Sequence, residues 1–271
     1  MTEFSRLSAL WASFYSRDLY RDVVTRWKGI GLVYLLLLLS LSWLPSMVRW
    51  FAGVGGFAAA AERTVVPQLP AISIKDGVMT ANPPGPRVVP FGAKRGSDEG
   101  LIIIDDTVDS VPADLNLSVD AFVLTRREAG VIRPSRHERR IWTLSGDFDV
   151  TPRDVSAFLS ALPFLVPPIG YVGAVAGSVV FRLLQALLYG ALSVAFAKRQ
   201  RVTLEYAAAV RLATVAVTPV VVIRTLLWFG ASDPAWYLRW PLALLMTLGY
   251  LAFGVRALAA PSPDAAQRQT I

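Results

Sequence analysis

The residues that could carry out chemistry are few, and most lie near the middle of the chain. The single histidine, His137, stands in the arginine-rich segment 133–140, and the chain has no cysteine. A Ser/His/Asp triad would have to use this histidine. Disulfides, cysteine-ligated zinc, iron–sulfur clusters and multi-histidine metal sites are excluded. We interpret His137 as part of a solvated strand entry, and we expect no enzymatic activity and no cofactor.

Aspartates form a second group. Asp105, Asp106 and Asp109 follow the apolar run 101–104, and Asp114 is near. Carboxylates this dense can hold calcium, and they could also serve a membrane enzyme that acts on lipid or glycan. The spacing and the glycine of an EF-hand are absent, however, and aspartates after a strand commonly cap turns. We therefore favour turn capping and predict no metal site.

Arginines form a third group in the same region. Its members are Arg126, Arg127, Arg133, Arg136, Arg139 and Arg140. Such a cluster could bind an anionic headgroup or a glycan. Glu128 and Glu138 lie between these arginines, which favours a solvated surface and keeps the anionic-ligand patch as the alternative.

The composition indicates the elements that must position these groups. Hydrophobic residues make up 54% of the chain and charged residues 17%, against roughly 45–50% and about 25% in soluble domains. The mean hydropathy is +0.47. This composition excludes a disordered tail, a collagen and an ordinary soluble enzyme. The net charge of +7 could suggest nucleic acid, but the positions of the basic residues favour a membrane surface, and we expect no nucleic-acid partner.

Four apolar segments are long enough to cross a bilayer, which takes about 20 residues. We predict transmembrane helices at residues 29–54, 169–197, 204–229 and 240–258, with a kink at Pro219. A cleaved signal peptide is the alternative for the first, because Ala58–Ala61 resembles a cleavage site. Residues 152–168 should form a separate interfacial segment. Thr151, Pro152 and Asp154 open its helix, and the prolines at 163, 167 and 168 break it.

The distribution of basic residues sets the orientation. Arginine and lysine are concentrated in residues 1–28 and in the loop 198–201, and the C-terminal segment adds Arg256 and Arg268. Because cytoplasmic segments carry this excess, we place both termini in the cytoplasm of a bacterial inner membrane. Tryptophans agree with this placement, since they are enriched at membrane interfaces. Trp27 would mark the inner interface, and Trp50, Trp228, Trp236 and Trp240 the outer one.

Residues 1–28 predict a basic amphipathic helix. Its apolar stripe consists of Phe4, Leu7, Leu10, Trp11 and Phe14, at three- and four-residue spacing. Such a helix lies in the headgroup plane. A docking helix for a cytoplasmic partner is the alternative.

Residues 55–151 predict a small β-rich domain outside the cytoplasm. Strands at 71–74 and 78–81 flank Lys75-Asp76-Gly77, which is a hairpin signal. Further strands are expected at 101–104, 121–125 and 140–144. Gly130 and Ser145-Gly146 are expected to form turns.

Two polar stripes occur inside the predicted spans. Arg182, Gln185 and Tyr189 share one helix face, and Arg211, Thr214 and Thr218 share another. If these stripes faced each other, they could line a transport path. At about 1.5 Å per residue, Arg182 lies roughly 24 Å from Lys198 and Arg211 about 9 Å from Glu205. Both therefore lie near an interface, where arginine can snorkel. Gly173 and Gly177 add a weak helix-packing motif in the second span.

One resemblance covers most of the chain. The segment 14–23, followed by Arg26-Trp27-Lys28-Gly29 and 34–37, resembles the opening of a bacterial membrane-protein family known only as a domain of unknown function. The similarity continues through Ile74-Lys75-Asp76-Gly77, 101–105 and the pattern of Tyr206, Ala208 and Thr218-Pro219. Some members carry a maltodextrin-utilisation label, and the family distantly resembles Yip-type proteins, which interact with trafficking GTPases. The resemblance implies an integral membrane protein with a large loop after the first span and brings no catalytic residues. Nothing in the sequence indicates a sugar site.

Together these features predict an α-helical membrane protein with four transmembrane helices and a β-rich extracytoplasmic domain between the first and second. We favour a non-enzymatic scaffold, sensor or accessory protein. Its partners would be the lipid bilayer and another membrane or envelope protein. A permease or an accessory subunit of a transporter is the main alternative.

Overall fold

The computed structural model describes residues 4–91, 100–113, 115, 117–229 and 236–259, and for 228, 229 and 236–240 the backbone alone. Several expectations lie outside these residues: Asp114, the tail 260–271, most of the loop before the last span, and the side chains of Trp228, Trp236 and Trp240. The chain divides into two compact units, residues 1–46 with 170–271 and residues 47–169.

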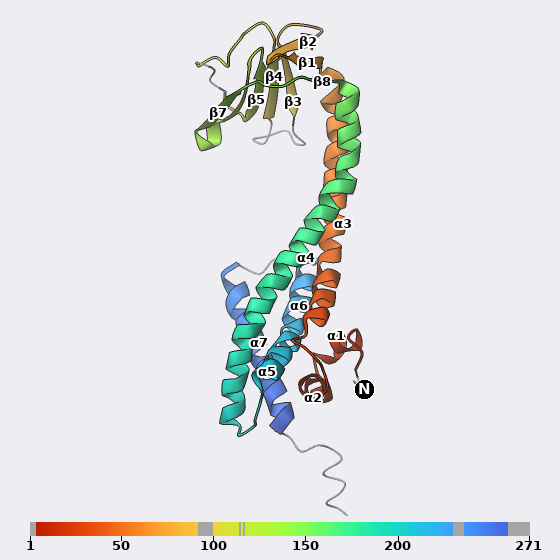
Figure 1. Cartoon of the computed structure of the whole chain (residues 1–271), viewed down its shortest axis with the longest axis vertical. Helices are drawn as coiled ribbons and strands as arrows, with labels where there is room; N and C mark the ends of the chain where they lie inside the picture. Colours follow the sequence, from red (N-terminus) through yellow and green to blue (C-terminus); the bar gives the residue numbers. More distant parts are fainter. Residues whose placement is uncertain (1–3, 92–99, 114, 116, 230–235, 260–271) are drawn as a thin grey trace, which may run out of the picture. The chain divides into compact units, whose positions relative to one another are not determined.

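The described residues are mostly helical (Figure 1). The helices are α1 (Ser8–Ala12), α2 (Arg17–Thr25), α3 (Leu32–Thr64), α4 (Pro152–Arg199), α5 (Tyr206–Ala216), α6 (Thr218–Phe229) and α7 (Trp236–Ala259), with short 3-10 turns η1 (Val66–Gln68) and η2 (Pro134–Arg136). Within the described part of the chain, four segments are long and apolar enough to cross a membrane: Leu32–Gln68, Pro152–Arg199, Tyr206–Leu227 and Pro241–Ala259. By length and composition, the chain therefore has the features of a multi-pass membrane protein, as the sequence predicts.

In the first unit, α5 lies at the centre. Leu212, Ala213, Val215 and Ala216 of this helix are buried in one apolar core, together with Leu35 and Leu38 of α3, Leu251 of α7 and other residues. Hydrogen bonds join α3 to α4 within this unit. The Trp43 Nε1 donates to Ser178 Oγ at 2.9 Å, and the Tyr171 hydroxyl donates to the Ser40 carbonyl at 3.0 Å.

The N-terminal segment differs from the single helix expected over residues 1–28. It consists of α1 and α2, which are separated at Ser16. Ser16 has an extended backbone, and its hydroxyl accepts the Leu19 amide at 3.2 Å, which caps the start of α2. α2 packs against α5 and α7 (Figure 1). Leu19, Tyr20 and Val23 are fully buried, so this half of the segment belongs to the core.

The third span is interrupted near the expected kink. α5 ends at Ala216 and α6 begins at Thr218, with Val217 between them. Proline has no amide hydrogen, so Pro219 cannot donate to the carbonyl four residues earlier. The helical direction continues after the break, since the Val221 amide donates to the Val217 carbonyl at 3.1 Å.

The second span differs from the expectation at its start. α4 is continuous from Pro152 to Arg199 and includes the three prolines at 163, 167 and 168 that were expected to break it. Each proline deprives only one carbonyl of its partner, whereas a helix end would leave four donors and four acceptors to satisfy in an apolar segment. The predicted helix start is confirmed. Thr151 and Asp154 exchange hydrogen bonds between side chain and backbone in a capping box.

The second unit contains two sheets besides the adjoining ends of α3 and α4. The first has the order β2-β1-β8, with β1 (Ala71–Lys75), β2 (Val78–Asn82) and β8 (Phe148–Val150). The second has the order β3-β4-β5-β6-β7, with β3 (Arg87–Phe91), β4 (Gly100–Asp105), β5 (Ala121–Thr125), β6 (Glu128–Arg133) and β7 (Glu138–Thr143). All pairs are antiparallel except β4–β5. Side chains from both sheets, including Ile74, Met79 and Ile104, form the main core.

The predicted hairpin is confirmed. β1 pairs with β2 across Asp76 and Gly77, whose φ angles are 50° and 72°. Two successive positive φ angles define the type I′ turn that favours Asp-Gly. A Cβ atom on Gly77 would lie 2.9 Å from the Leu144 carbonyl oxygen. Both the positive φ angle and this close approach therefore require glycine at position 77.

The expected turn at Gly130 is wrong. Gly130 lies inside β6, opposite Ile141 of β7, and a Cβ there would lie 3.2 Å from the Arg140 carbonyl oxygen. The glycine therefore allows close strand approach and does not reverse the chain. The sequence also did not predict β3, which contains Pro90 and lies at a sheet edge, where proline is tolerated.

Candidate functional site

Arg211 is among the most extensively bound of the predicted site residues. From α5, its guanidinium donates to three main-chain carbonyls: Val23 at 3.1 Å, Val24 at 3.0 Å and Gly29 at 3.0 Å. Val23 and Val24 belong to the last turn of α2, whose carbonyls lack helical partners. A cation at a helix C-terminus also interacts favourably with the helix dipole. Arg211 thus caps α2 and holds the following turn against α5.

The other members of this stripe bind to the same region. The Thr214 hydroxyl donates to the Val210 carbonyl at 2.9 Å and lies 3.4 Å from that of Ile30. The Thr218 hydroxyl is 2.7 Å from that of Tyr34 on α3. Gly31 fits between them, since a Cβ there would approach Thr214 Cγ2 to 3.3 Å and its φ is +79°. We call this set of contacts around Arg211, Thr214 and Thr218 the α5 junction.

α2 is also fastened to α7. The Arg21 Nε donates to the Ala257 carbonyl at 2.8 Å, and the Tyr20 ring lies edge-on to Phe253, with centroids 5.6 Å apart. Gly254 makes room for this ring, because a Cβ there would lie 2.7 Å from Tyr20 Cδ1. The Tyr20 hydroxyl donates to the Ser13 carbonyl, and its burial raises the pKa well above the ordinary value. The sequence did not lead us to Tyr20 as a candidate residue. The spacing of the apolar residues Leu19, Tyr20 and Val23 was the signal that could have indicated it.

Asp22 is a buried carboxylate within α2. The Trp27 Nε1 donates to its Oδ2 at 3.1 Å, and Arg26 Nη1 lies 3.6 Å from its Oδ1. Its partners thus come from the turn that follows α2. The sequence did not single out this aspartate, although a carboxylate four residues before an arginine on a helix indicates such a pair.

The stripe on α4 forms a separate chain of contacts. The Arg182 Nη1 donates to Gln185 Oε1, and the Gln185 Nε2 donates to the Tyr189 hydroxyl at 3.0 Å. All three residues lie on α4, whereas the described bonds of the α5 stripe go to residues 23–34 and to Val210 of α5 itself. Among the described residues, no hydrogen bond joins the two stripes, and the transport path stays a prediction of the sequence.

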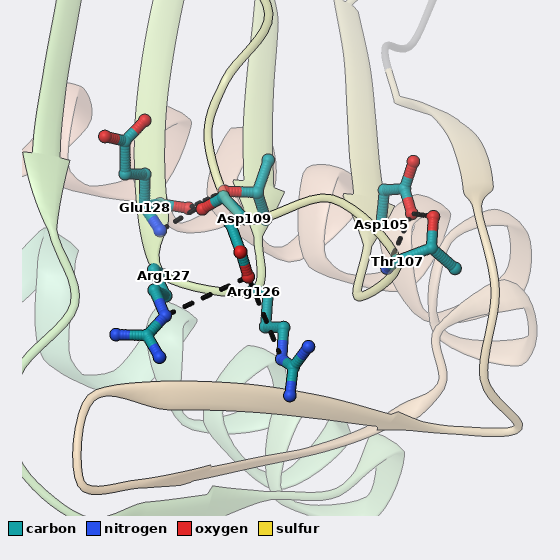
Figure 2. A network of polar contacts seen from close by, with 7 residues as sticks. Asp105, Thr107, Asp109, Arg126, Arg127 and Glu128 are labelled. Carbon is teal, nitrogen blue, oxygen red and sulfur yellow. Dashed lines mark hydrogen bonds and ion pairs between the residues drawn. The ribbon is translucent and has the colours of Figure 1, made fainter.

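The six arginines of the β-rich unit are also divided. Arg126 and Arg127 lie in the β5–β6 turn, and their Nε atoms are each 3.9 Å from Asp109 Oδ1 (Figure 2). Arg133, Arg136, Arg139 and Arg140 lie at or beyond the far end of β6 or on β7. Because β6 rises about 3.3 Å per residue, Arg133 lies roughly 20 Å along the strand from Arg127, and Arg140, opposite Val131, roughly 13 Å. The anionic-ligand patch stays a prediction of the sequence.

Most members of the second group have partners of their own. Glu138 lies 3.2 Å from Arg133 Nη1 and 2.6 Å from Arg140 Nε. The hydrogen bond from Arg133, with the charge of Arg140, lowers the pKa of Glu138. Arg139 donates to the carbonyls of Val111, Pro112 and Ala113. Beyond η2, His137 has a left-handed backbone with φ 51°, as expected of a turn residue.

Each described aspartate after β4 has a different set of partners. Asp105 accepts the amide and hydroxyl of Thr107 (Figure 2). Asp106 accepts the Gly85 amide at 2.8 Å and the Ala81 amide at 3.1 Å. The bond from Gly85 chiefly lowers the pKa of Asp106. Among the residues that the structure describes, no three histidine, cysteine or acidic residues converge on a point where a metal could bind.

Most of the chain matches a known protein family. A family model described as "Protein of unknown function (DUF1189)" matches residues 7–255. The chain belongs to this family. No curated protein and no solved structure matches it. The DUF1189 match confirms the expected membership of a family of unknown function, while the distant Yip-type relationship stays a prediction of the sequence.

The DUF1189 match includes both candidate regions. The α5 junction and the arginines of the β-rich unit all fall within residues 7–255. In the α5 junction, Arg211 binds main-chain carbonyls, and no nucleophile or general base is among its described partners. The chemistry of this junction is therefore the positioning of helices.

Proposed function

We propose that this DUF1189 protein is a non-enzymatic accessory protein of the bacterial inner membrane, acting as a scaffold or sensor for another envelope component. Both termini lie in the cytoplasm, and the β-rich unit lies on the other side. The excess of basic residues at the termini and in the loop 198–201 supports this orientation.

The main support for this proposal comes from the edge strand β7. β7 stands at one end of the five-stranded sheet, and every residue from Arg139 to Thr143 is exposed. Ile141 and Trp142 are large apolar side chains among them. An exposed edge with apolar residues is a template for strand addition, which proteins normally block unless a partner uses it. We therefore assign the contact with the envelope partner to β7.

A transport role receives less support. It would need the two intramembrane stripes to face a common path. The α5 stripe is bound to the carbonyls of Val23, Val24 and Gly29 and to the hydroxyl of Tyr34. Only the chain of Arg182, Gln185 and Tyr189 on α4 is left to line such a path.

Site-specific photo-crosslinking in intact cells tests the assignment of β7. A photoreactive amino acid at Ile141 should give one discrete adduct with an envelope protein. The same residue at Val88 serves as the control, because Val88 is exposed on β3 at the opposite edge of the sheet. Equal adducts at both positions, or none at Ile141, would contradict the assignment.

The placement in the membrane has its own test. The chain should stay in the pellet after an alkaline wash, and a reporter fused after Ile271 should be active only in the cytoplasm. A soluble chain, or a reporter active outside the cytoplasm, would overturn the proposed orientation while leaving the crosslinking result to be explained separately.

A further inference from the structure

A cavity of about 350 Å³ lies in the first unit, lined by residues 4–6 and 27–34. One side of it is the segment before α1, and the other is the turn from α2 into α3. This volume is within the range of small-ligand sites, about 300–1,000 Å³. The proposed envelope partner contacts a different unit of the chain, so the proposed function does not account for this cavity.

The charged residues of the lining are of one sign. Arg6 and Lys28 line the cavity, and its lining contains no aspartate or glutamate. Both side chains are exposed, so neither must lose much hydration before a ligand arrives. α3 begins at Leu32 on the same wall, and the start of a helix adds a partial positive charge. The cavity therefore favours an anion.

Apolar and aromatic residues line the cavity together with these two basic residues. They include Phe4, Leu32 and Val33, and also Trp27 and Tyr34, whose rings stand edge-on with centroids 5.4 Å apart. A small hydrophilic anion such as free phosphate gains nothing from such walls. A molecule with an anionic group next to hydrocarbon matches both parts of the lining.

The surroundings place this cavity at the surface of the membrane. Leu7, Trp11 and Tyr15 form a ridge on α1 and just after it, at four-residue spacing, with 59%, 73% and 73% of their surface exposed. Aromatic and leucine side chains exposed next to basic residues are typical of segments that lie among lipid headgroups. Among the lining residues, Ile30, Leu32 and Val33 are exposed where the first span begins.

We propose that this cavity binds the headgroup of an anionic phospholipid. Arg6 and Lys28 contact the phosphodiester, and Phe4, Leu32 and Val33 contact the start of the acyl chains. The site holds the N-terminal segment on the cytoplasmic leaflet, and a bound lipid bridges α1 and the α2–α3 turn.

Native mass spectrometry of the full-length, detergent-solubilised chain tests this site. The probe is dioctanoyl phosphatidylglycerol, and dioctanoyl phosphatidylcholine is the zwitterionic comparison. The double variant Arg6→Gln/Lys28→Gln should bind the phosphatidylglycerol about 30-fold more weakly, since each basic residue near an anionic lipid contributes about a factor of five. Arg6→Lys/Lys28→Arg, which keeps both charges, should bind as the parent does.

The matched control removes two charges elsewhere. Arg127→Gln/Arg136→Gln alters the β-rich unit by the same net charge and should leave the affinity unchanged. Equal loss in this control, or parental affinity in Arg6→Gln/Lys28→Gln, would overturn the site. Equal binding of the two lipids would also overturn it. Displacement of the lipid by excess inorganic phosphate would assign the cavity to a free anion and overturn the lipid assignment.

Discussion

The second and third spans have nearly the same hydropathy but different surroundings. Their most apolar windows average 1.8 for α4 and 1.9 for the α5–α6 segment, yet 22% of the first window and 72% of the second are buried within the protein. Hydropathy thus reports that a helix tolerates an apolar environment. It does not report whether lipid or protein supplies that environment.

Small side chains accompany the greater burial of the α5–α6 segment. α5 buries Ala208, Ala209, Ala213 and Ala216, and small residues let helices approach closely in membranes. At Gly190 of α4, a Cβ atom would lie 2.7 Å from Val210 Cγ2 and 3.2 Å from the Val210 backbone nitrogen. The close contact of α4 with α5 thus lies at Gly190, whereas Cβ atoms on Gly173 and Gly177 would meet nothing within 4 Å.

Replacing Arg211 and Arg182 by methionine, one at a time, should give the largest difference in the free energy of unfolding. Arg211→Met removes three charge-assisted bonds and leaves the last carbonyls of α2 without partners, so we expect a loss of about 3 kcal/mol. Arg182→Met removes one bond to a neighbour on its own helix and should cost less than about 1 kcal/mol. Reversible unfolding in mixed micelles measures both values. Equal losses would show that the α5 junction does not hold α2.

Glycine-to-alanine variants on α4 should sharpen the comparison further. Gly190→Ala forces a Cβ against Val210 and should destabilise the chain by about 2 kcal/mol. Gly177→Ala meets open space and gains helix propensity, so its effect should lie between zero and a gain of about 1 kcal/mol. The same unfolding assay compares them. A loss in Gly177→Ala similar to that in Gly190→Ala would show that the Gly173/Gly177 motif packs against another helix or another copy of the chain.

Two tyrosines provide a smaller test. Tyr20→Phe removes a buried bond from the hydroxyl to the Ser13 carbonyl and should cost about 1 kcal/mol. Tyr206→Phe removes a bond to the Leu187 carbonyl at an exposed position and should cost less than about 0.5 kcal/mol. Thermal unfolding of both variants at one detergent concentration provides the measurement. A larger effect at Tyr206 would mean that α4 and α5 are held together by this bond more than by packing.

Acid pH should weaken hydrogen bonds in the β-rich unit and leave those of the two spans unchanged. The pKa of Asp106 is lowered below its ordinary 3.8 by the amides of Gly85 and Ala81. The carboxylate is therefore stabilising at all pH values above about 3.8, and its contribution is lost as the pH falls through the lower folded value. Hydrogen exchange of the amides at 81 and 85 should accelerate below that pH. The arginine bonds of the α5 junction go to carbonyls and should not respond.

The variant Asp106→Asn is the control for this prediction. It should accelerate the same amides at neutral pH, by an amount that corresponds to about 1 kcal/mol, and should remove the acid-dependent step. If the variant kept the step, another carboxylate would be responsible for it.

The sequence predicted features that depend on neighbouring residues. Lys75, Asp76 and Gly77 predict a hairpin because glycine accepts a positive φ angle. Thr151, Pro152 and Asp154 predict a helix start because the cap and the first turn involve adjacent residues. The four apolar segments follow from length and hydropathy alone. Each of these features is decided by a few adjacent residues.

Features that depend on distant residues could not be predicted. Gly130 has the composition of a turn, and only the approach of β7 explains it as a strand residue. The periodicity of residues 1–28 indicates an apolar face, but the partners of α2 are α5 and α7, far along the chain. The same is true of Arg211, whose partners are 182 to 188 residues away.

The contact between Arg21 and Ala257 spans 236 residues, and it has a consequence for biosynthesis. α2 is among the first helices to leave the ribosome, whereas its partners α5 and α7 are among the last. Docking of α2 against α7 therefore waits until α7 has been synthesised. Until then, the surface of α2 that α7 covers, with the Tyr20 ring against Phe253, has no contact with that helix.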